Sequence, residues 1–199
     1  MPPETWTRVS VRRTHLELRS LADLRAAAAP AEPAELVDAR LSPKEYLALY
    51  TLVGDRWLWR DRLVWTEAEL EAYLATPDVR IWTLLVRGER AGYFELRQHP
   101  DRSMELMYFG LAPKFMGRRL GGWLLTRAVE KAFSLGATRV FLNTCTLDAP
   151  QALPNYLARG FRIMSEDQYL LDVPVRAQER QQQEQVLPVA AGRMPSART

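Results

Sequence analysis

The chain has 199 residues, of which 47% are hydrophobic and 26% are charged, and its formal net charge is +3 at pH 7. This composition is typical of a globular protein with one buried core, so a single domain over residues 1–175 is expected. No apolar run approaches the ~20 residues that cross a bilayer, so no membrane contact is expected. The one cysteine, Cys145, excludes an internal disulfide and a cysteine-rich metal site.

Three further patterns narrow the class of protein. Lysine and arginine are scattered along the chain, whereas a nucleic-acid-binding domain concentrates them on one face. The only histidines are His15 and His99, so neither a histidine-ligated metal site nor a Ser-His-Asp triad is expected. The first six residues lack the basic start and apolar run of a secretory signal, which predicts a cytoplasmic protein.

Before residue 78 the sequence predicts one strand and two helices. Ser42, with Glu45 three residues later, is typical of a helix N-cap, and Thr66 with Glu69 repeats the pattern. Gly54 and Pro77 are the expected stops. The predicted elements are a strand or short hairpin at a sheet edge over 7–19, a helix from Ser42 to Gly54 and a helix over 66–75.

The middle of the chain predicts an antiparallel meander followed by a long helix. The three strands are expected over 79–86, 91–98 and 104–111. Apolar residues then recur at helical spacing from Gly117 to Leu135, and Gly136 is a typical C-terminal cap. A strand over 138–147 follows this crossover helix and should run parallel to 104–111.

The last part predicts a short helix over 150–159 and a final strand pair over 161–165 and 168–173. Together these elements define an α/β fold with a mixed sheet and flanking helices. Beyond Pro174 the chain is rich in Gln, Glu, Arg and Ala. A disordered or frayed tail is therefore expected from about 176 to 199.

The most informative stretch is the glycine-spaced, basic turn Gly117-Arg118-Arg119-Leu120-Gly121-Gly122, which opens the long helix. The first amides of a helix lack partners and share the positive end of its dipole, so they bind phosphate. Glycines let a bulky anion approach the backbone, and the two arginines add charge. We interpret the turn as a pyrophosphate site, although glycines here also suit tight turns and helix packing.

Two familiar phosphate-binding motifs do not match this turn. A Walker loop needs Gly-Lys-Ser/Thr at its end, whereas Gly122 is followed by Trp123. A dinucleotide fingerprint needs GxGxxG after the first strand of a parallel unit, and the turn has no GxG and follows antiparallel strands.

The order of these features resembles the GCN5-related N-acetyltransferase superfamily, whose members transfer acetyl from acetyl-coenzyme A to amines. The family pattern is a strand Glu, a Pro eight residues later, a Gln/Arg-x-x-Gly-x-Gly/Ala turn and a Tyr-x-x-x-Gly-Phe ending. This sequence meets it with Glu105, Pro113, the 116–121 turn and the 156–161 segment. The resemblance is strong over 79–173 and weak before it.

The resemblance implies roles for particular residues. Glu105 would remove the proton of the acceptor amine, with Glu95 in reserve, and Tyr156 would protonate the leaving thiolate. The backbone of Phe109 and Leu111 would pair with the pantetheine arm. The cofactor acetyl-CoA would bind at Met116, Gly117, Arg118, Arg119, Leu120, Gly121 and Gly122, and no metal is implied.

The sequence departs from the family pattern at three positions. Met116 replaces the usual Gln or Arg, Arg119 replaces the middle Gly, and Ala149 replaces a frequent Asn. An arginine at 119 stores about 1 kcal/mol of strain if that position needs positive φ. Cys145, in an apolar strand, is interpreted as packing and not as a nucleophile.

Several alternatives stay open. The acceptor amine is either a small molecule or a polypeptide, and a homodimer is compatible with the sequence. Trp57, Trp59 and Trp65 are either core residues or the lining of an acceptor pocket. The alternative to an enzyme is a non-catalytic acyl-CoA-binding or interaction module with the same fold.

Overall fold

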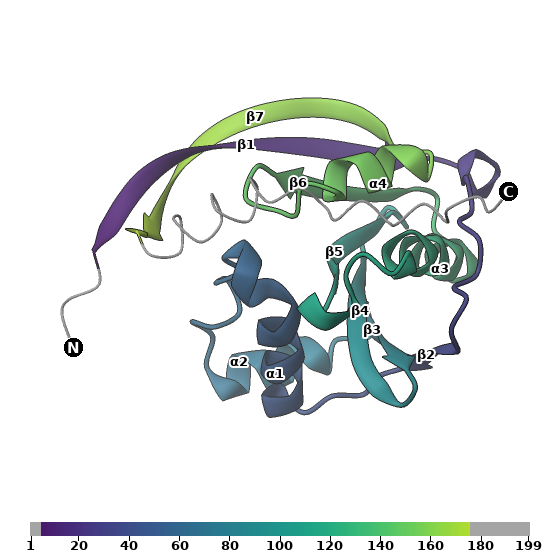
Figure 1. Ribbon diagram of the computed structural model, residues 1–199, viewed down its shortest axis with the longest axis horizontal. Helices are drawn as coiled ribbons and strands as arrows, with labels where there is room; N and C mark the ends of the chain where they lie inside the picture. Colours follow the sequence, from purple (N-terminus) through teal and green to yellow (C-terminus); the bar gives the residue numbers. More distant parts are fainter. Residues whose placement is uncertain (1–4, 176–199) are drawn as a thin grey trace, which may run out of the picture.

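A seven-stranded mixed sheet organises residues 5–175, the part of the chain that the computed structural model describes (Figure 1). The strand order is β2-β3-β4-β5-β6-β1-β7. The strands are β1 (Trp6–Leu18), β2 (Ala34–Asp38), β3 (Val79–Val86), β4 (Glu89–Gln98), β5 (Met104–Leu111), β6 (Val140–Cys145) and β7 (Arg162–Pro174).

Four α-helices and three 3-10 turns connect the strands within the described residues. The helices are α1 (Pro43–Gly54), α2 (Glu67–Leu74), α3 (Leu120–Ser134) and α4 (Ala152–Ala158), and the turns are η1 (Leu21–Asp23), η2 (Asp55–Trp57) and η3 (Pro113–Phe115). Ser42 and Thr66 each form a complete capping box with the glutamate three residues later. The two helix starts predicted from this spacing are therefore confirmed.

The helices divide between the two faces of the sheet, and each face has its own core. On one face, α3 and α4 pack on β4, β5 and β6 through residues such as Leu96, Leu124 and Tyr156. On the other face, α1 and α2 pack on β3, β4 and β5 through an aromatic cluster that includes Tyr46 and Tyr93. Figure 1 shows α1 and α2 on the side of the sheet opposite α3.

Two sequence predictions about strands are wrong. The N-terminal strand is not at the edge of the sheet, because β1 lies between β6 and β7 and is antiparallel to both. The expected pair over 161–165 and 168–173 is one continuous strand, β7. Its polar centre is typical of a turn in sequence. In the structure, Glu166 accepts a hydrogen bond from Thr14 of β1, and Asp167 bonds to Arg13 and His15 of the same strand.

The meander and the parallel crossover are confirmed, with one local feature that affects the site. β4 pairs with β5 along its length, but the register shifts between Glu95 and Leu96, so Met107 has no partner across the ladder. A bulge of this kind bends a strand and redirects its side chains. β5 and β6 are parallel, yet only Met104 and Glu105 pair with Val140 and Phe141.

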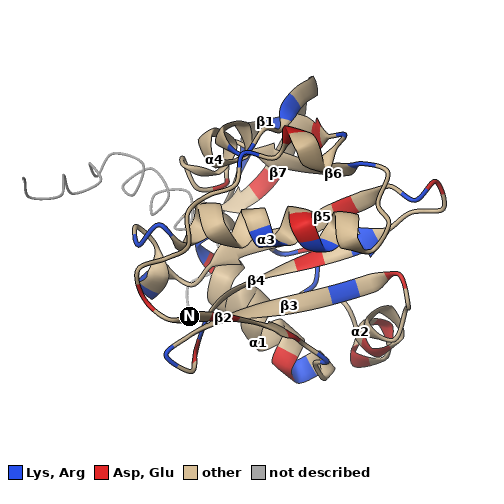
Figure 2. Ribbon diagram, turned by 90° about the vertical axis from the view of Figure 1, so that its right-hand side faces the viewer, with Lys and Arg blue, Asp and Glu red and all other residues tan. Residues whose placement is uncertain are grey.

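α3 begins at Leu120, three residues later than predicted, because Gly117 and Arg119 both have left-handed backbone angles. The tail expected beyond residue 176 lies outside the described residues. Figure 2 shows Lys and Arg interspersed with Asp and Glu over the ribbon. Within residues 5–175, no helix has the length and apolar character needed to cross a membrane.

Candidate active site

The turn before α3 leaves the first amides of this helix without a cap. η3 ends in extended backbone at Met116, with φ −70° and ψ 155°, and Gly117 then has φ +74°. The N-cap residue, Arg119, has φ +62° and makes no side-chain hydrogen bond to the helix. The N–H groups of the first turn therefore have no acceptor within the helix, which is the arrangement that binds anions.

The backbone angles of Arg119 answer whether its position in the turn needs a positive φ. Its φ of +62° and ψ of 11° lie in the left-handed region, where a residue with a side chain costs about 1 kcal/mol or more. The strain is local, since the other departure, Met116, adopts ordinary extended backbone. Arg119 therefore adds a cation to the turn at a cost in stability.

Arg118 is oriented by two neighbours. Its guanidinium forms an ion pair with Glu32 and lies 4.9 Å from the centroid of the Phe115 ring. Glu32 comes from the segment between η1 and β2, so this segment runs past the start of α3. A phosphate at the turn would compete with the Glu32 carboxylate for the same cation.

Gly121 and Gly122 face α4 and permit its close approach. Asn155 donates a hydrogen bond to the Gly121 carbonyl at 3.4 Å. A Cβ on Gly122 would lie 2.5 Å from Nη1 of Arg159, whereas one on Gly121 would meet only ordinary contacts of 3.8 Å or more. The Arg159 side chain is flexible and could move aside, so packing alone does not require glycine at 122, and a role in phosphate contact remains a prediction for both glycines.

A gap between β5 and β6 opens beside this turn. Since ladder pairs join the two strands only at Met104 and Glu105, the rest of β5 has no partner on its β6 side. Phe109 and Leu111 lie on this unpaired stretch, and the Leu111 side chain is near Gly121 of α3. The splay of β5 away from β6 leaves its backbone without a strand partner there, which is what an extended ligand arm needs.

Glu105 lies at the point where β5 and β6 part. Its side chain is 19% exposed, and its Oε2 is 2.9 Å from Nε2 of His99. His99 is itself 33% exposed and lies 5.3 Å from the ring of Phe141, the β6 residue opposite Glu105. The carboxylate thus has an acid–base partner that contacts water, and sequence reasoning missed this histidine because it lies in a turn.

Tyr156 extends from α4 toward the same gap. Its ring packs against Phe109 and Phe161, with centroids 6.0 Å away in each case. Burial, and then the nearby Asp148 carboxylate, raise the pKa of its hydroxyl well above the usual value. No residue between 5 and 175 forms a hydrogen bond with that hydroxyl, so a protonated donor is left free beside the gap.

Glu95, the reserve candidate for a base, is in the core of the other face. It is fully buried, and its carboxylate accepts hydrogen bonds from Tyr46, at 2.8 Å, and from Tyr73. The Arg62 guanidinium is 4.0 Å away. Burial raises the pKa of Glu95. These contacts give the carboxylate a structural role and argue against a part in the reaction.

The tryptophan-rich segment after α1 packs into the same core. The Trp59 ring lies 5.0 Å from Tyr108 and 5.5 Å from Tyr50. The Arg62 guanidinium is 4.0 Å from the Trp65 ring. The structure therefore favours the core interpretation for Trp59 and Trp65.

Asp148 is a site residue that sequence reasoning missed. It follows β6 directly, accepts hydrogen bonds from Oγ1 of Thr144 at 2.7 Å and from the Cys145 amide at 2.9 Å, and is also reached by the Trp59 indole. Burial raises its pKa. The sequence signal that could have indicated Asp148 is its position after the carboxyl end of a strand expected to run parallel to its neighbour. Burial also raises the pKa of Cys145, which fits an unreactive thiol.

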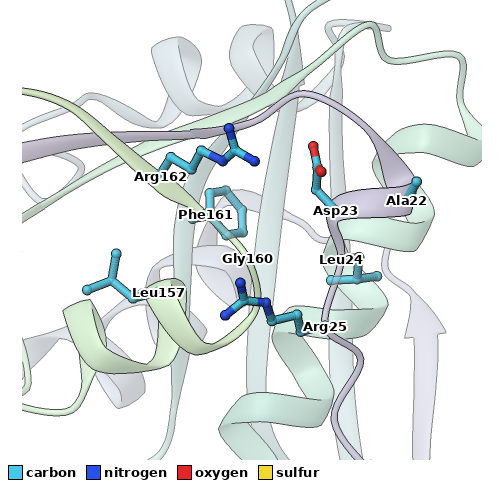
Figure 3. Close-up of a pocket in the computed structure, with 8 residues that line it drawn as sticks. All are labelled: Ala22, Asp23, Leu24, Arg25, Leu157, Gly160, Phe161 and Arg162. Carbon is cyan, nitrogen blue, oxygen red and sulfur yellow. The ribbon is translucent and has the colours of Figure 1, made fainter.

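A separate hollow of about 410 Å³ lies between η1 and the turn from α4 to β7 (Figure 3). Asp23, Arg25 and Arg162 give it a polar lining, and Gly160, with φ +99°, lets the two segments touch. None of the predicted site residues lines it. Within residues 5–175, no group of His, Cys, Asp or Glu is arranged to hold a metal ion.

The fold and the α3 turn together define an acetyltransferase-like α/β protein. The sequence model of the Acetyltransferase (GNAT) family matches residues 46–161, more than half of the chain. The chain belongs to this family. A comparison with curated proteins gave no match.

Solved structures with the same fold are distant in sequence. A GCN5-related N-acetyltransferase from Kribbella flavida is 21% identical with a TM-score of 0.59, over 85% of this chain and 60% of that one. One from Sphaerobacter thermophilus is 14% identical with a TM-score of 0.54, over 85% and 53%. A Bacillus subtilis acetyltransferase in complex with CoA is 20% identical with a TM-score of 0.52, over 67% and 79%. This chain thus spans about 60% of the length of the first of these neighbours.

Proposed function

We propose that this protein transfers acetyl from acetyl-CoA to an amine, by direct attack of the amine in a ternary complex. The observation that carries the proposal is the placement of the uncapped start of α3 beside the open gap between β5 and β6. Glu105 lies at the inner end of that gap, and the ring of Tyr156 packs against Phe109 on the unpaired stretch of β5. Family membership supports the same reaction class.

The residues of the turn fit the pyrophosphate of acetyl-CoA. The free amides of the turn and first helical turn, Gly117 to Gly122, would hold the phosphates, with Arg118 and Arg119 supplying charge. Bound acetyl-CoA supplies an acetyl group activated as a thioester. The backbone of Phe109 and Leu111 would hold the pantetheine arm as an added strand, because β5 has no partner there.

Glu105 would remove a proton from the acceptor amine. An amine with a pKa near ~10.4 is almost wholly protonated at neutral pH, so it becomes a nucleophile only when a base takes that proton. His99, at 2.9 Å and one-third exposed, gives the proton a route from the Glu105 carboxylate to water. The proton therefore moves from nitrogen to carboxylate to imidazole to solvent.

Tyr156 would supply the proton of the leaving thiol. Its raised pKa keeps the hydroxyl protonated near neutral pH, so a proton is present when the thiolate leaves. Its ring is fixed between Phe109 and Phe161, so the hydroxyl has a defined position beside the gap. Among the described residues, no other tyrosine both lies beside the gap between β5 and β6 and has a hydroxyl without a hydrogen-bond partner.

The proposal is tested by calorimetric titration with acetyl-CoA, followed by an amine panel assayed for free thiol. Micromolar binding and thiol release are expected. Binding without thiol release from any amine would favour the non-catalytic acyl-CoA-binding module, and no binding would refute both interpretations.

A charge-reversal variant separates the α3 turn from other binding sites. Gly121→Asp adds a carboxylate where a Cβ meets only ordinary contacts, and an acidic residue suits a helix start, so the fold should persist. Acetyl-CoA affinity should fall at least ~10-fold, since a like charge then faces the diphosphate. Gly88→Asp, in the open turn between β3 and β4, adds the same charge away from α3 and is the control. Its φ of +78° strains any side chain, but aspartate tolerates this backbone better than most residues, so the variant should fold and bind as the wild type does.

A further inference from the structure

A cavity at the carboxyl end of β6 lies next to the proposed reaction centre. Its volume is about 410 Å³. Thr14 of β1 and Thr144 of β6 are ladder partners, so both side chains point to the α4 side of the sheet and form the cavity floor. The remaining lining residues are Arg12, Cys145, Thr146, Asp148, Ala149, Pro150 and Leu153.

Asp148 provides a fixed carboxylate at one wall. Its hydrogen bonds from the Thr144 hydroxyl, at 2.7 Å, and from the Cys145 amide, at 2.9 Å, hold it in place. Leu153, which also lines the cavity, lies three residues before Tyr156 on α4, so the cavity and the proposed acid share one side of that helix.

Arg12 provides the opposite charge. Two hydrogen bonds join its backbone to Thr146, from the Arg12 amide to Oγ1 at 3.3 Å and from the Thr146 amide to the Arg12 carbonyl at 3.0 Å. On the same strand, Arg8 and Arg13 form ion pairs with Asp172 and Asp167. No carboxylate of residues 5–175 pairs with Arg12, so its guanidinium remains free to bind an anionic group.

We propose that this cavity binds the acceptor, and that the acceptor is a small amine which also carries a carboxylate, as a free amino acid does. Asp148 would hold the ammonium group, and Arg12 would hold the carboxylate. This inference rests on the proposed acetyl transfer, since the cavity adjoins α4, the helix that carries Tyr156. For such an acceptor Asp148, and not Glu105, would be the carboxylate nearest the amine, because Glu105 lies opposite Phe141, at the other end of β6.

The size and walls of the cavity agree with such a molecule. A volume of 410 Å³ lies in the range of small-ligand pockets and holds one amino-acid-sized molecule. Ala149, Pro150 and Leu153 make one side apolar, which suits a side chain with little charge. A cavity with one carboxylate and one guanidinium can pair both charges of a zwitterion, whereas a simple amine pairs only with Asp148 and leaves the exposed Arg12 guanidinium in water.

Binding of matched pairs tests the inference without any need for acetyl transfer. L-phenylalanine against 2-phenylethylamine, L-tryptophan against tryptamine and L-lysine against cadaverine differ only by the carboxylate. Each is titrated by calorimetry into the full chain, with and without CoA. The wild type should bind at least one amino acid ten times more tightly than its partner amine.

Two variants and one control assign the effect to the cavity. Arg12→Gln should abolish the preference for the carboxylate, and Asp148→Asn should weaken both members of the pair. Arg8→Gln, which removes an arginine from the same strand at a remote position, should leave the preference intact. Thermal melts check that each variant folds. If Asp148→Asn does not fold, Arg12→Gln still tests the inference, because Arg12 is exposed.

The outcomes separate this inference from the proposed function. Equal affinity for the members of every pair, or no binding of any probe, overturns the acceptor assignment. Preferential binding that Arg12→Gln leaves unchanged also overturns it. Acetylation of amines without any carboxylate preference would leave the proposed function standing and this inference refuted. Preference for the amino acid without thiol release would support the cavity and remove the reaction.

Discussion

Replacing Tyr156 by phenylalanine removes the proposed acid while keeping the ring that packs against Phe109 and Phe161. The hydroxyl forms no hydrogen bond with residues 5–175, so its loss leaves no partner unsatisfied and stability should change by less than about 1 kcal/mol. General acid catalysis contributes about 10²–10⁴-fold to a rate. Turnover should therefore fall about 10²-fold or more, which corresponds to about 2.7 kcal/mol of lost transition-state stabilisation.

The assay combines thiol release, for turnover, with calorimetric titration of acetyl-CoA. The dissociation constant should stay within about twofold, because in the proposed complex the phosphates would be held at α3 and not by this hydroxyl. Tyr50→Phe deletes a buried hydroxyl from the α1–α2 core and is the matched control, with turnover expected to match the wild type. Wild-type turnover in Tyr156→Phe would remove this residue from the acid role, and a large loss of acetyl-CoA affinity would show that the hydroxyl binds the cofactor.

Three further predictions follow from individual residues. Glu105→Gln should lower kcat/KM about 10²-fold and change its pH profile, and an identical profile would move the base role elsewhere. Arg119→Gly should relieve the strain of φ +62° and raise Tm by about 2–4 °C for a gain near 1 kcal/mol; an unchanged or lower Tm in thermal melts would contradict the strain argument. Burial raises the pKa of Glu95, so the folded state binds its proton more tightly than the unfolded state does. That contribution is fully present below the unfolded pKa of about 4.3 and is lost as pH rises through the raised folded pKa. Glu95→Gln should remove this decline in stability, so the urea midpoint of the variant should change less than that of the wild type between pH 5 and pH 8. Equal declines in the two proteins would refute this account of Glu95.

Local sequence patterns predict the elements whose ends are determined by neighbouring residues. Ser42 and Thr66 place α1 and α2 because each cap bonds to a glutamate three residues away. The meander β3–β4–β5 is predictable for the same reason, since short turns join strands that pair with their sequence neighbours. The anion-binding character of the 116–122 turn is a prediction from the orphaned amides at any helix start, whereas its left-handed angles and the later start of α3 were not predicted.

Long-range pairing is where the sequence predictions are wrong or incomplete. β1 and β7 are about 150 residues apart, and only their ladder shows that β1 is internal and that β7 is unbroken. The polar residues Glu166 and Asp167 favour a turn on local grounds, whereas ion pairs and hydrogen bonds from β1 keep them extended. Local propensity is a weak determinant when a neighbouring strand supplies every partner.

The candidate site likewise contains some residues that the sequence indicated and others that only the fold brings together. Its candidate phosphate-binding turn was indicated by glycine spacing and charge, and Glu105 and Tyr156 were indicated by the resemblance of their motifs to the acetyltransferase family. His99 beside Glu105, Asp148 beside Tyr156 and the unpaired Arg12 at a shared cavity could not be found in this way, because each depends on which strand ends meet in space. The sequence alone determined the helices, the meander and the chemistry of the α3 turn, since contacts between near neighbours dictate these. Only the tertiary structure decided the strand order and the charges around the gap, because those contacts join residues too far apart in sequence for any local pattern to encode.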